Sequence, residues 1–206
     1  MDKNRLEAFS DGVIAVIITI MVLEMKVPHG PEFDALAPLL PVFLTYVVSF
    51  VYVGIYWNNH HHMFKLTESV NGAVLWANLH LLFWLSLLPF STGWLGENHF
   101  SRLPMVLYGL NLLLAALAYY VLQLQLSSVH GPGNAIEQAL GRDVKGKASP
   151  LIYVAGMAAA WWVQPWLGFA AFAAAALIWL VPDRRMEQAV SQRHAAERST
   201  GADSER

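Results

Sequence analysis

Long apolar stretches dominate the chain, and each is close to the length that a helix needs to cross a bilayer. Six stretches have this character, at about residues 6–25, 36–57, 73–92, 104–126, 149–163 and 166–181. A bilayer-spanning helix needs about 20 mainly apolar residues. The pattern therefore predicts an all-α, polytopic membrane protein with six transmembrane helices.

The last two apolar stretches are separated only by Gln164 and Pro165. Read as one helix, residues 151–181 are too long for a single crossing. Proline inside a helix removes a backbone hydrogen bond and breaks the helix, so Pro165 marks a boundary. We therefore expect a tight helical hairpin at this point and an even number of spans.

Composition supports the membrane interpretation and excludes several other classes. Of the 206 residues, 56% are hydrophobic and 14% are charged, against about 45–50% and about 25% in soluble domains. The net charge of −2 offers no basic excess for nucleic acid. The absence of cysteine removes disulfides and thiolate catalysis. No triad or carboxylate pair stands out, so we expect neither an enzyme nor a cofactor.

Basic residues indicate how the chain crosses the membrane. Cytoplasmic loops are enriched in Lys and Arg. If both termini are cytoplasmic, only Lys26 and Arg102 of the 13 basic residues fall outside. We therefore predict a multi-pass protein of the cell inner (plasma) membrane with both termini in the cytoplasm. Residues 1–183 form the membrane domain and residues 184–206 a polar cytoplasmic tail.

The first apolar stretch carries more polar residues than a membrane helix usually tolerates, and such residues are often functional. At 3.6 residues per turn, Arg5 extends one face at its cytoplasmic end, while Glu7 and Asp11 lie on roughly the opposite side. The rest of that first face is small, branched or hydroxylated: Gly12, Val16, Thr19, Ile20 and Leu23.

Periodicity leaves two interpretations of this face open. In the first, it is an ordinary packing surface, with the Thr19 hydroxyl bonded to its own helix. Alternatively, the face lines a pore in an oligomer, where rings of Val16 and Ile20 side chains gate by excluding water. A neighbouring ring of Thr19 hydroxyls would then replace part of the hydration of an ion.

Residue identity adds a resemblance to a known family. Arg5, the run Phe9-Ser10-Asp11-Gly12 and the following apolar residues to Pro28 closely resemble the first helix of bacterial members of the transmembrane-protein-175 potassium channel family. The segments 56–62 and 88–92, read as Tyr-Trp-Asn-Asn-His-His-His and Leu-Pro-Phe-Ser-Thr, are similar to this family's second and third helices. The resemblance covers nearly the whole chain.

The resemblance implies a potassium-permeable channel that conducts passively. It implies a homotetramer in the lipid bilayer, with the first helices around a central pore for monovalent cations. The narrowest apolar ring maps to Val16, where an isoleucine is usual, and further layers map to Ile20 and Leu23. A threonine layer that favours potassium maps to Thr19. Potassium is then the permeant species and no cofactor is implied.

The signature residues have a structural role in this interpretation. Asp11 lies off the pore face, so we expect it to tie the first helix to its neighbours through hydrogen bonds. Its possible partners are Arg5, residues 60–62, Asn78 and His80, and the sequence does not choose among them. The predicted signature network comprises Arg5, Phe9, Ser10, Asp11 and His80.

One alternative function stays open, and the run of histidines needs an interpretation of its own. A secondary transporter or proton-coupled permease requires a midplane site, usually at broken helices, and here Pro41 and Pro89 are not a matched pair. The histidines at 60–62 invite a metal interpretation, but adjacent helical residues point about 100° apart. A polar contact between helices is therefore expected for these histidines instead of a metal site.

Overall fold

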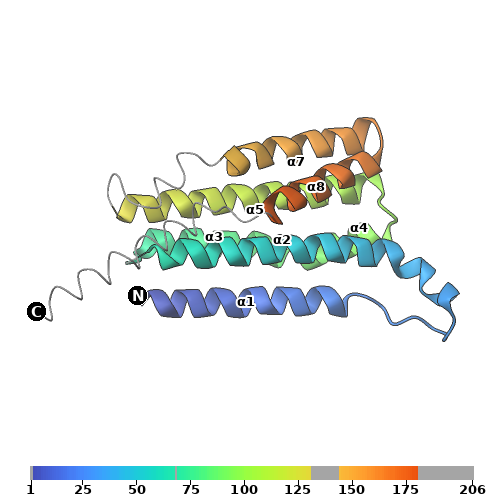
Figure 1. Ribbon diagram of the computed structural model, residues 1–206, viewed down its shortest axis with the longest axis horizontal. Coiled ribbons are helices and arrows are strands. Elements are labelled where there is room, and N and C mark those ends of the chain that lie inside the picture. Colours follow the sequence, from blue (N-terminus) through green and yellow to red (C-terminus); the bar gives the residue numbers. More distant parts are fainter. Residues whose placement is uncertain (1, 68, 131–143, 181–206) are drawn as a thin grey trace, which may run out of the picture.

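The computed structural model describes residues 2–67, 69–130 and 144–180. Within these ranges every regular element is helical, and long rods lie side by side along the longest dimension of the molecule (Figure 1). The all-α prediction is confirmed. The predicted tail at 184–206 lies outside the described residues. The α-helices are α1 (Lys3–Leu23), α2 (Leu40–Lys65), α3 (Gly72–Ser86), α4 (Leu88–Glu97), α5 (Arg102–Val129), α7 (Val144–Trp162) and α8 (Pro165–Leu180).

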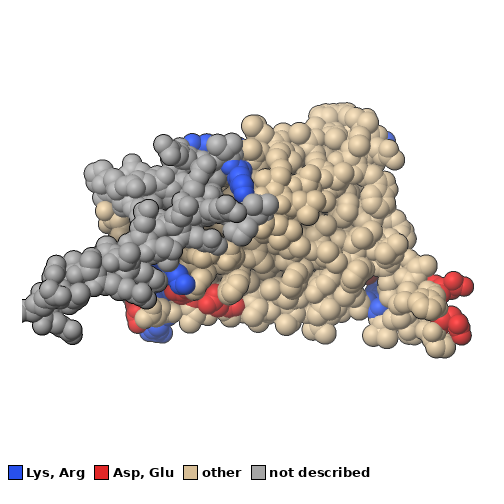
Figure 2. Space-filling model, in the orientation of Figure 1, with Lys and Arg blue, Asp and Glu red and all other residues tan. Residues whose placement is uncertain are grey.

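Four segments of the described chain are long and apolar enough to cross a membrane: Lys3–Leu23, Phe33–Lys65, Gly72–Glu97 and Arg102–Val129. Helix α8 is apolar but has only 16 residues, and α7 has 19. These two helices form the predicted hairpin, because α7 ends at Trp162 and α8 begins at Pro165. On the face shown in Figure 2, an uncharged band separates charged side chains at the two ends of the molecule.

The third predicted span is not one continuous helix. It breaks at Leu87, between α3 and α4, and Pro89 lies in the first turn of α4. Proline has no backbone N–H and its ring clashes with the carbonyl four residues earlier, which here belongs to Leu85. The expectation of a single helix over residues 73–92 was therefore wrong in detail, although α3 and α4 together still make one rod.

Helices α5, α7 and α8 pack closely because glycines remove side chains where they meet. The buried ring of Phe172 on α8 lies over Gly109 of α5 and Gly156 of α7. A Cβ atom built at these two positions would come within 2.5 Å and 2.6 Å of that ring. Small residues of this kind allow close approach of membrane helices, so these three helices form a rigid layer of the bundle.

Helix α1 lies at the opposite margin of the bundle (Figure 1). It packs on α2, α3 and α4. The buried positions of α1 recur every three or four residues, as one helical face requires: Leu6, Ser10, Ile14, Ile17 and Met21. The other face of α1 is therefore left uncovered by the rest of the subunit.

Candidate pore face and signature network

The uncovered face of α1 carries the residues that the sequence assigned to a pore. Val16, Ile20 and Leu23 are 54%, 41% and 78% exposed, and Thr19 is exposed between them. We call these four residues the pore face. No residue of the pore face belongs to the buried core of the subunit, so all four are available to contact another copy, lipid or water.

The Thr19 hydroxyl has a defined orientation within this face. Its Oγ1 donates to the backbone carbonyl of Val16 at 2.9 Å. This bond to the preceding turn is the local interaction that the sequence left as one option. Because the hydroxyl hydrogen is used in this bond, the oxygen presents lone pairs outward. Such an oxygen can face a cation, so the local bond and an ion contact are compatible.

An open groove runs between α1 and α4 beside the pore face. Its volume is about 860 Å³, and Gly12, Val16 and Ile20 line it from the α1 side. Glu24 and Glu97 also line it, from α1's C-cap and from α4. The groove therefore combines a mainly apolar lining with two carboxylates, and the Glu97 carboxylate is paired with Lys26.

The end of the molecule at which α1 stops is acidic. Figure 2 shows acidic side chains at that end. Glu24 follows α1, Glu32 and Asp34 lie between α1 and α2, and Glu97 ends α4. Lys26 Nζ pairs with Glu97 Oε1 at 2.6 Å. The hydrogen bond from Lys26 to Glu97 raises the pKa of that lysine above its ordinary value. The pair ties the end of α1 to the end of α4.

A buried chain of polar side chains joins α1, α2 and α3. Asn78 Nδ2 donates to Ser10 Oγ at 2.9 Å, and Ser10 Oγ donates to the Leu6 carbonyl at 2.9 Å. The side-chain oxygen of Asn78, Oδ1, accepts from His60 Nε2 at 2.8 Å. All three side chains are buried. Ser10, Asn78 and His60 therefore form one connected network in an otherwise apolar interface.

Two further contacts join α1 to α2 at the edge of this network. Trp57 Nε1 donates to Asp11 Oδ1 at 3.0 Å. His61 Nδ1 pairs with Glu7 Oε1 at 3.0 Å. The carboxylates of α1 thus face away from the pore face and toward α2, which orients the helix about its own axis.

The structure brings together only part of the predicted signature network. Ser10 and Asp11 contact neighbouring helices, whereas Arg5 and Phe9 are exposed. His80 lies apart from the network, and its Nε2 accepts from Trp84 Nε1 of the same helix at 2.9 Å.

The sequence did not show that Asp11 would pair with Trp57, or that Glu7 would pair with His61. Asn78 was a possible partner of Asp11 but instead bonds Ser10. The available signal was the isolation of Asn78 in an apolar helix, because such a residue must find a partner. Trp57 gave no such signal, since tryptophan near a span end is typical of the membrane interface.

The three consecutive histidines separate in the way that helical geometry requires. His60 faces Asn78 on α3, and His61 faces Glu7 on α1. Among the described residues, no group of three or more metal-ligand side chains is found. His60 and His61 therefore hold helices together, as the expected polar contact requires.

Comparisons with known proteins agree with this architecture. The family model described as endosomal/lysosomal potassium channel TMEM175 matches residues 5–89. A potassium channel of Chryseobacterium sp. (strain P1-3) is 48% identical over 192 residues, which cover 93% of this chain and all of that protein. The human endosomal/lysosomal proton channel TMEM175 is 31% identical over 116 residues, which are 50% of this chain and 23% of that protein.

A solved structure is also similar. The crystal structure of a lysosomal potassium-selective channel TMEM175 homolog from Chamaesiphon minutus superposes with a TM-score of 0.76 at 26% identity. The match covers 87% of this chain and 96% of that one. The match in sequence along nearly the whole chain, together with this shared fold, shows that the chain belongs to the TMEM175 family.

Proposed function

We propose that this protein is a potassium channel subunit whose copies surround an ion path lined by Val16, Thr19, Ile20 and Leu23. Passive potassium conduction accords with the family and with relatives that are named potassium channels. The observation that carries the pore assignment is the uncovered face of α1 at the margin of the bundle. A single subunit encloses no path along this face, so conduction requires symmetric copies, and we propose a homotetramer.

The chemistry of the pore face suits a hydrophobic gate. Rings of branched apolar side chains exclude water when they are close together, which blocks ions without any charge. Val16 is smaller than the isoleucine of the family pattern, so its ring leaves a wider constriction. Thr19 lies between the rings of Val16 and Ile20 and presents oxygen lone pairs, which replace part of the hydration that a potassium ion loses there.

The acidic end and the buried network support this function from outside the constriction. Glu24, Glu97 and their acidic neighbours raise the local concentration of cations before they enter the pore. The bonds made by Ser10 and Asp11 fix the rotation of α1, so that its apolar face and not its carboxylates points toward the axis. We infer that the signature residues position the pore helix and do not contact the ion.

Orientation follows from charge. Lys3, Arg5, Lys65, Lys145 and Lys147 lie at the end of the bundle where α1 begins, which the excess of basic residues assigns to the cytoplasm. We therefore propose that both termini are cytoplasmic in the cell inner membrane, and that residues 184–206 form a cytoplasmic tail beyond the channel domain at 1–183. No cofactor is needed for such conduction.

Potassium flux into proteoliposomes tests the function directly. Purified protein should support downhill potassium movement that is unchanged when the proton gradient is collapsed. Val16→Ala should increase this flux without dissociating the oligomer, because it widens an apolar ring. A matched substitution of an exposed apolar residue on another helix, Leu103→Ala, should leave the flux unchanged.

Two outcomes would contradict the proposal. Flux that stops when the proton gradient is collapsed would indicate a proton-coupled transporter, the main alternative. Flux that is equal for the wild type and Val16→Ala would remove Val16 from the ion path. Because one relative is named a proton channel, proton flux should be recorded in the same vesicles with an internal pH dye.

A further inference from the structure

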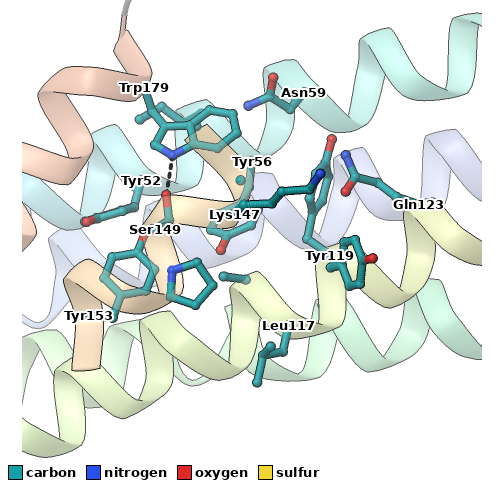
Figure 3. Close-up of a pocket in the computed structure, with 15 residues that line it drawn as sticks. Tyr52, Tyr56, Asn59, Leu117, Tyr119, Gln123, Lys147, Ser149, Tyr153 and Trp179 are labelled. Carbon is teal, nitrogen blue, oxygen red and sulfur yellow. Dashed lines mark hydrogen bonds between the residues drawn. The ribbon is translucent and has the colours of Figure 1, made fainter. Parts of the chain in front are cut away.

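A second cavity lies within the subunit, away from the pore face. Its volume is about 270 Å³, and residues of α2, α5, α7 and α8 line it (Figure 3). Aromatic rings make up much of its wall: Tyr52, Tyr56, Tyr119 and Tyr153. A cavity of this kind, mostly apolar with a few polar groups, is typical of a small-molecule or lipid site.

One end of the cavity holds amide groups without partners. Gln123 of α5 is only 7% exposed, and its side chain forms no hydrogen bond within the described residues. Asn59 of α2 is partly buried and is likewise unpaired in that part of the chain. Figure 3 shows these two amides on the same side of the cavity. Neither amide is among the fully buried unpaired groups of the described residues, so both reach the cavity, where an occupant can bond to them.

Charge at this end indicates an anionic occupant. Lys147 of α7 lines the cavity, and Figure 3 shows its side chain extending among the other lining residues. No Asp or Glu is among the described residues that line the cavity. Lysine has only donors, and each amide supplies two N–H donors. Together they offer several donors and one positive charge to the oxygens of a phosphate or carboxylate.

At the other end of the cavity, several polar groups are already paired within the described residues. Tyr52 donates its hydroxyl to the Phe172 carbonyl at 2.7 Å. Trp179 Nε1 donates to Ser149 Oγ at 2.7 Å, and Ser149 donates to the Lys145 carbonyl at 2.9 Å. Because these donors are already paired, the surface that they leave to an occupant is ring and hydrocarbon. The cavity is therefore amphipathic.

The cavity reaches the apolar outer surface of the subunit. Leu117 and Tyr120 of α5 line it and are themselves exposed. We propose that the cavity binds an anionic bilayer amphiphile, with its acidic headgroup held by Lys147, Gln123 and Asn59. Part of its acyl chain lies among the tyrosine rings. The shared chemistry is an acidic headgroup on an acyl chain, which either a phospholipid or a free fatty acid supplies.

Native mass spectrometry of the purified, delipidated oligomer tests this site. The probes are phosphatidylglycerol, oleate and phosphatidylcholine, added at equal concentrations. We expect one phosphatidylglycerol or oleate bound per subunit and little phosphatidylcholine. Lys147→Gln and Gln123→Leu should each weaken that binding about tenfold, the effect of losing roughly one charge-assisted hydrogen bond.

A matched control lies two residues away. Lys145→Gln removes the same charge from the same helix but at a position that does not line the cavity, so it should bind as the wild type does. Lys147→Arg should retain binding. Gel filtration of every variant establishes that the oligomer is intact. Preference for phosphatidylglycerol over oleate, or the reverse, identifies the source of the headgroup.

Three results would overturn the site. They are absence of binding by both anionic probes, equal binding of phosphatidylcholine, and equal losses in Lys145→Gln and Lys147→Gln. The readout is binding and not conduction, so it does not depend on the pore assignment. Conduction without lipid binding would contradict only this site, and lipid binding without conduction would contradict only the pore assignment.

Discussion

Asn78→Ala is the substitution that most sharply tests how α1 is held. Asn78 is fully buried and donates to Ser10 on α1 while accepting from His60 on α2. Alanine removes both bonds at once. It also leaves the Nε2–H of His60 buried without an acceptor, since no other bond to that atom is present among the described residues.

The expected cost follows from these losses. Side-chain hydrogen bonds between membrane helices average about 0.6 kcal/mol and reach about 1.7 kcal/mol. Leaving a buried donor unpaired costs about 1–3 kcal/mol. Counting His60 only once, the lost Ser10 bond and the unpaired His60 donor together cost about 2–5 kcal/mol. For a chain of this length that corresponds to a fall in the midpoint of thermal unfolding of about 4–20 °C.

Unfolding can be followed by tryptophan fluorescence of the purified oligomer in detergent. The matched control is His80→Ala, two residues further along α3, which removes an exposed bond to Trp84 and should shift the midpoint much less. A double-mutant cycle with Ser10→Ala should be non-additive, because both changes break the same bond. Equal midpoints for Asn78→Ala and His80→Ala would refute the assignment of the network as the anchor of α1.

Two further predictions concern helix packing and orientation. Gly96→Ala should prevent stable folding, because its Cβ would lie 2.6 Å from the Cα of Val42 on α2. Gly93→Ala is the control, because a Cβ there meets open space and the protein should fold normally. Expression yield and gel filtration of the two variants provide the comparison. Trp57→Phe should lower the thermal midpoint by less than Asn78→Ala does, because it removes one exposed bond to Asp11. A larger fall for Trp57→Phe would place the main anchor at Asp11.

The helical rods were accessible from the sequence for a physical reason. Bilayer thickness fixes the length of a spanning helix, so apolar length alone located every rod. Pro165 marked the hairpin because proline starts a helix well and cannot continue one. Pro89 likewise marks the start of α4 and the break at Leu87. That break was not predicted, because the apolar stretch continues without interruption across Leu87.

The sequence alone did not show which polar side chains bond to each other. Ser10 and Asp11 are adjacent in sequence, yet one bonds to α3 and the other to α2. Which neighbour each meets depends on the rotation of three helices about their axes, and that rotation is set by packing of the whole core. His80 shows the converse, because its position in an apolar helix suggested a contact between helices but Trp84 satisfies it locally.

The pore assignment also has a direct test, because the chain contains no cysteine. A single Val16→Cys substitution then provides the one thiol that a water-soluble, positively charged thiosulfonate reagent can modify. Such reagents react with the thiolate, which forms where water has access. Leu103→Cys, exposed on α5 but away from α1, provides the matched control.

Potassium flux through reconstituted Val16→Cys protein, measured before and after the reagent, shows whether Val16 lines the ion path. We predict that modification blocks the flux in Val16→Cys and leaves Leu103→Cys and the wild type unchanged. Unchanged flux through Val16→Cys after the same treatment would contradict it, because a bulky charged group at that position cannot coexist with an ion path.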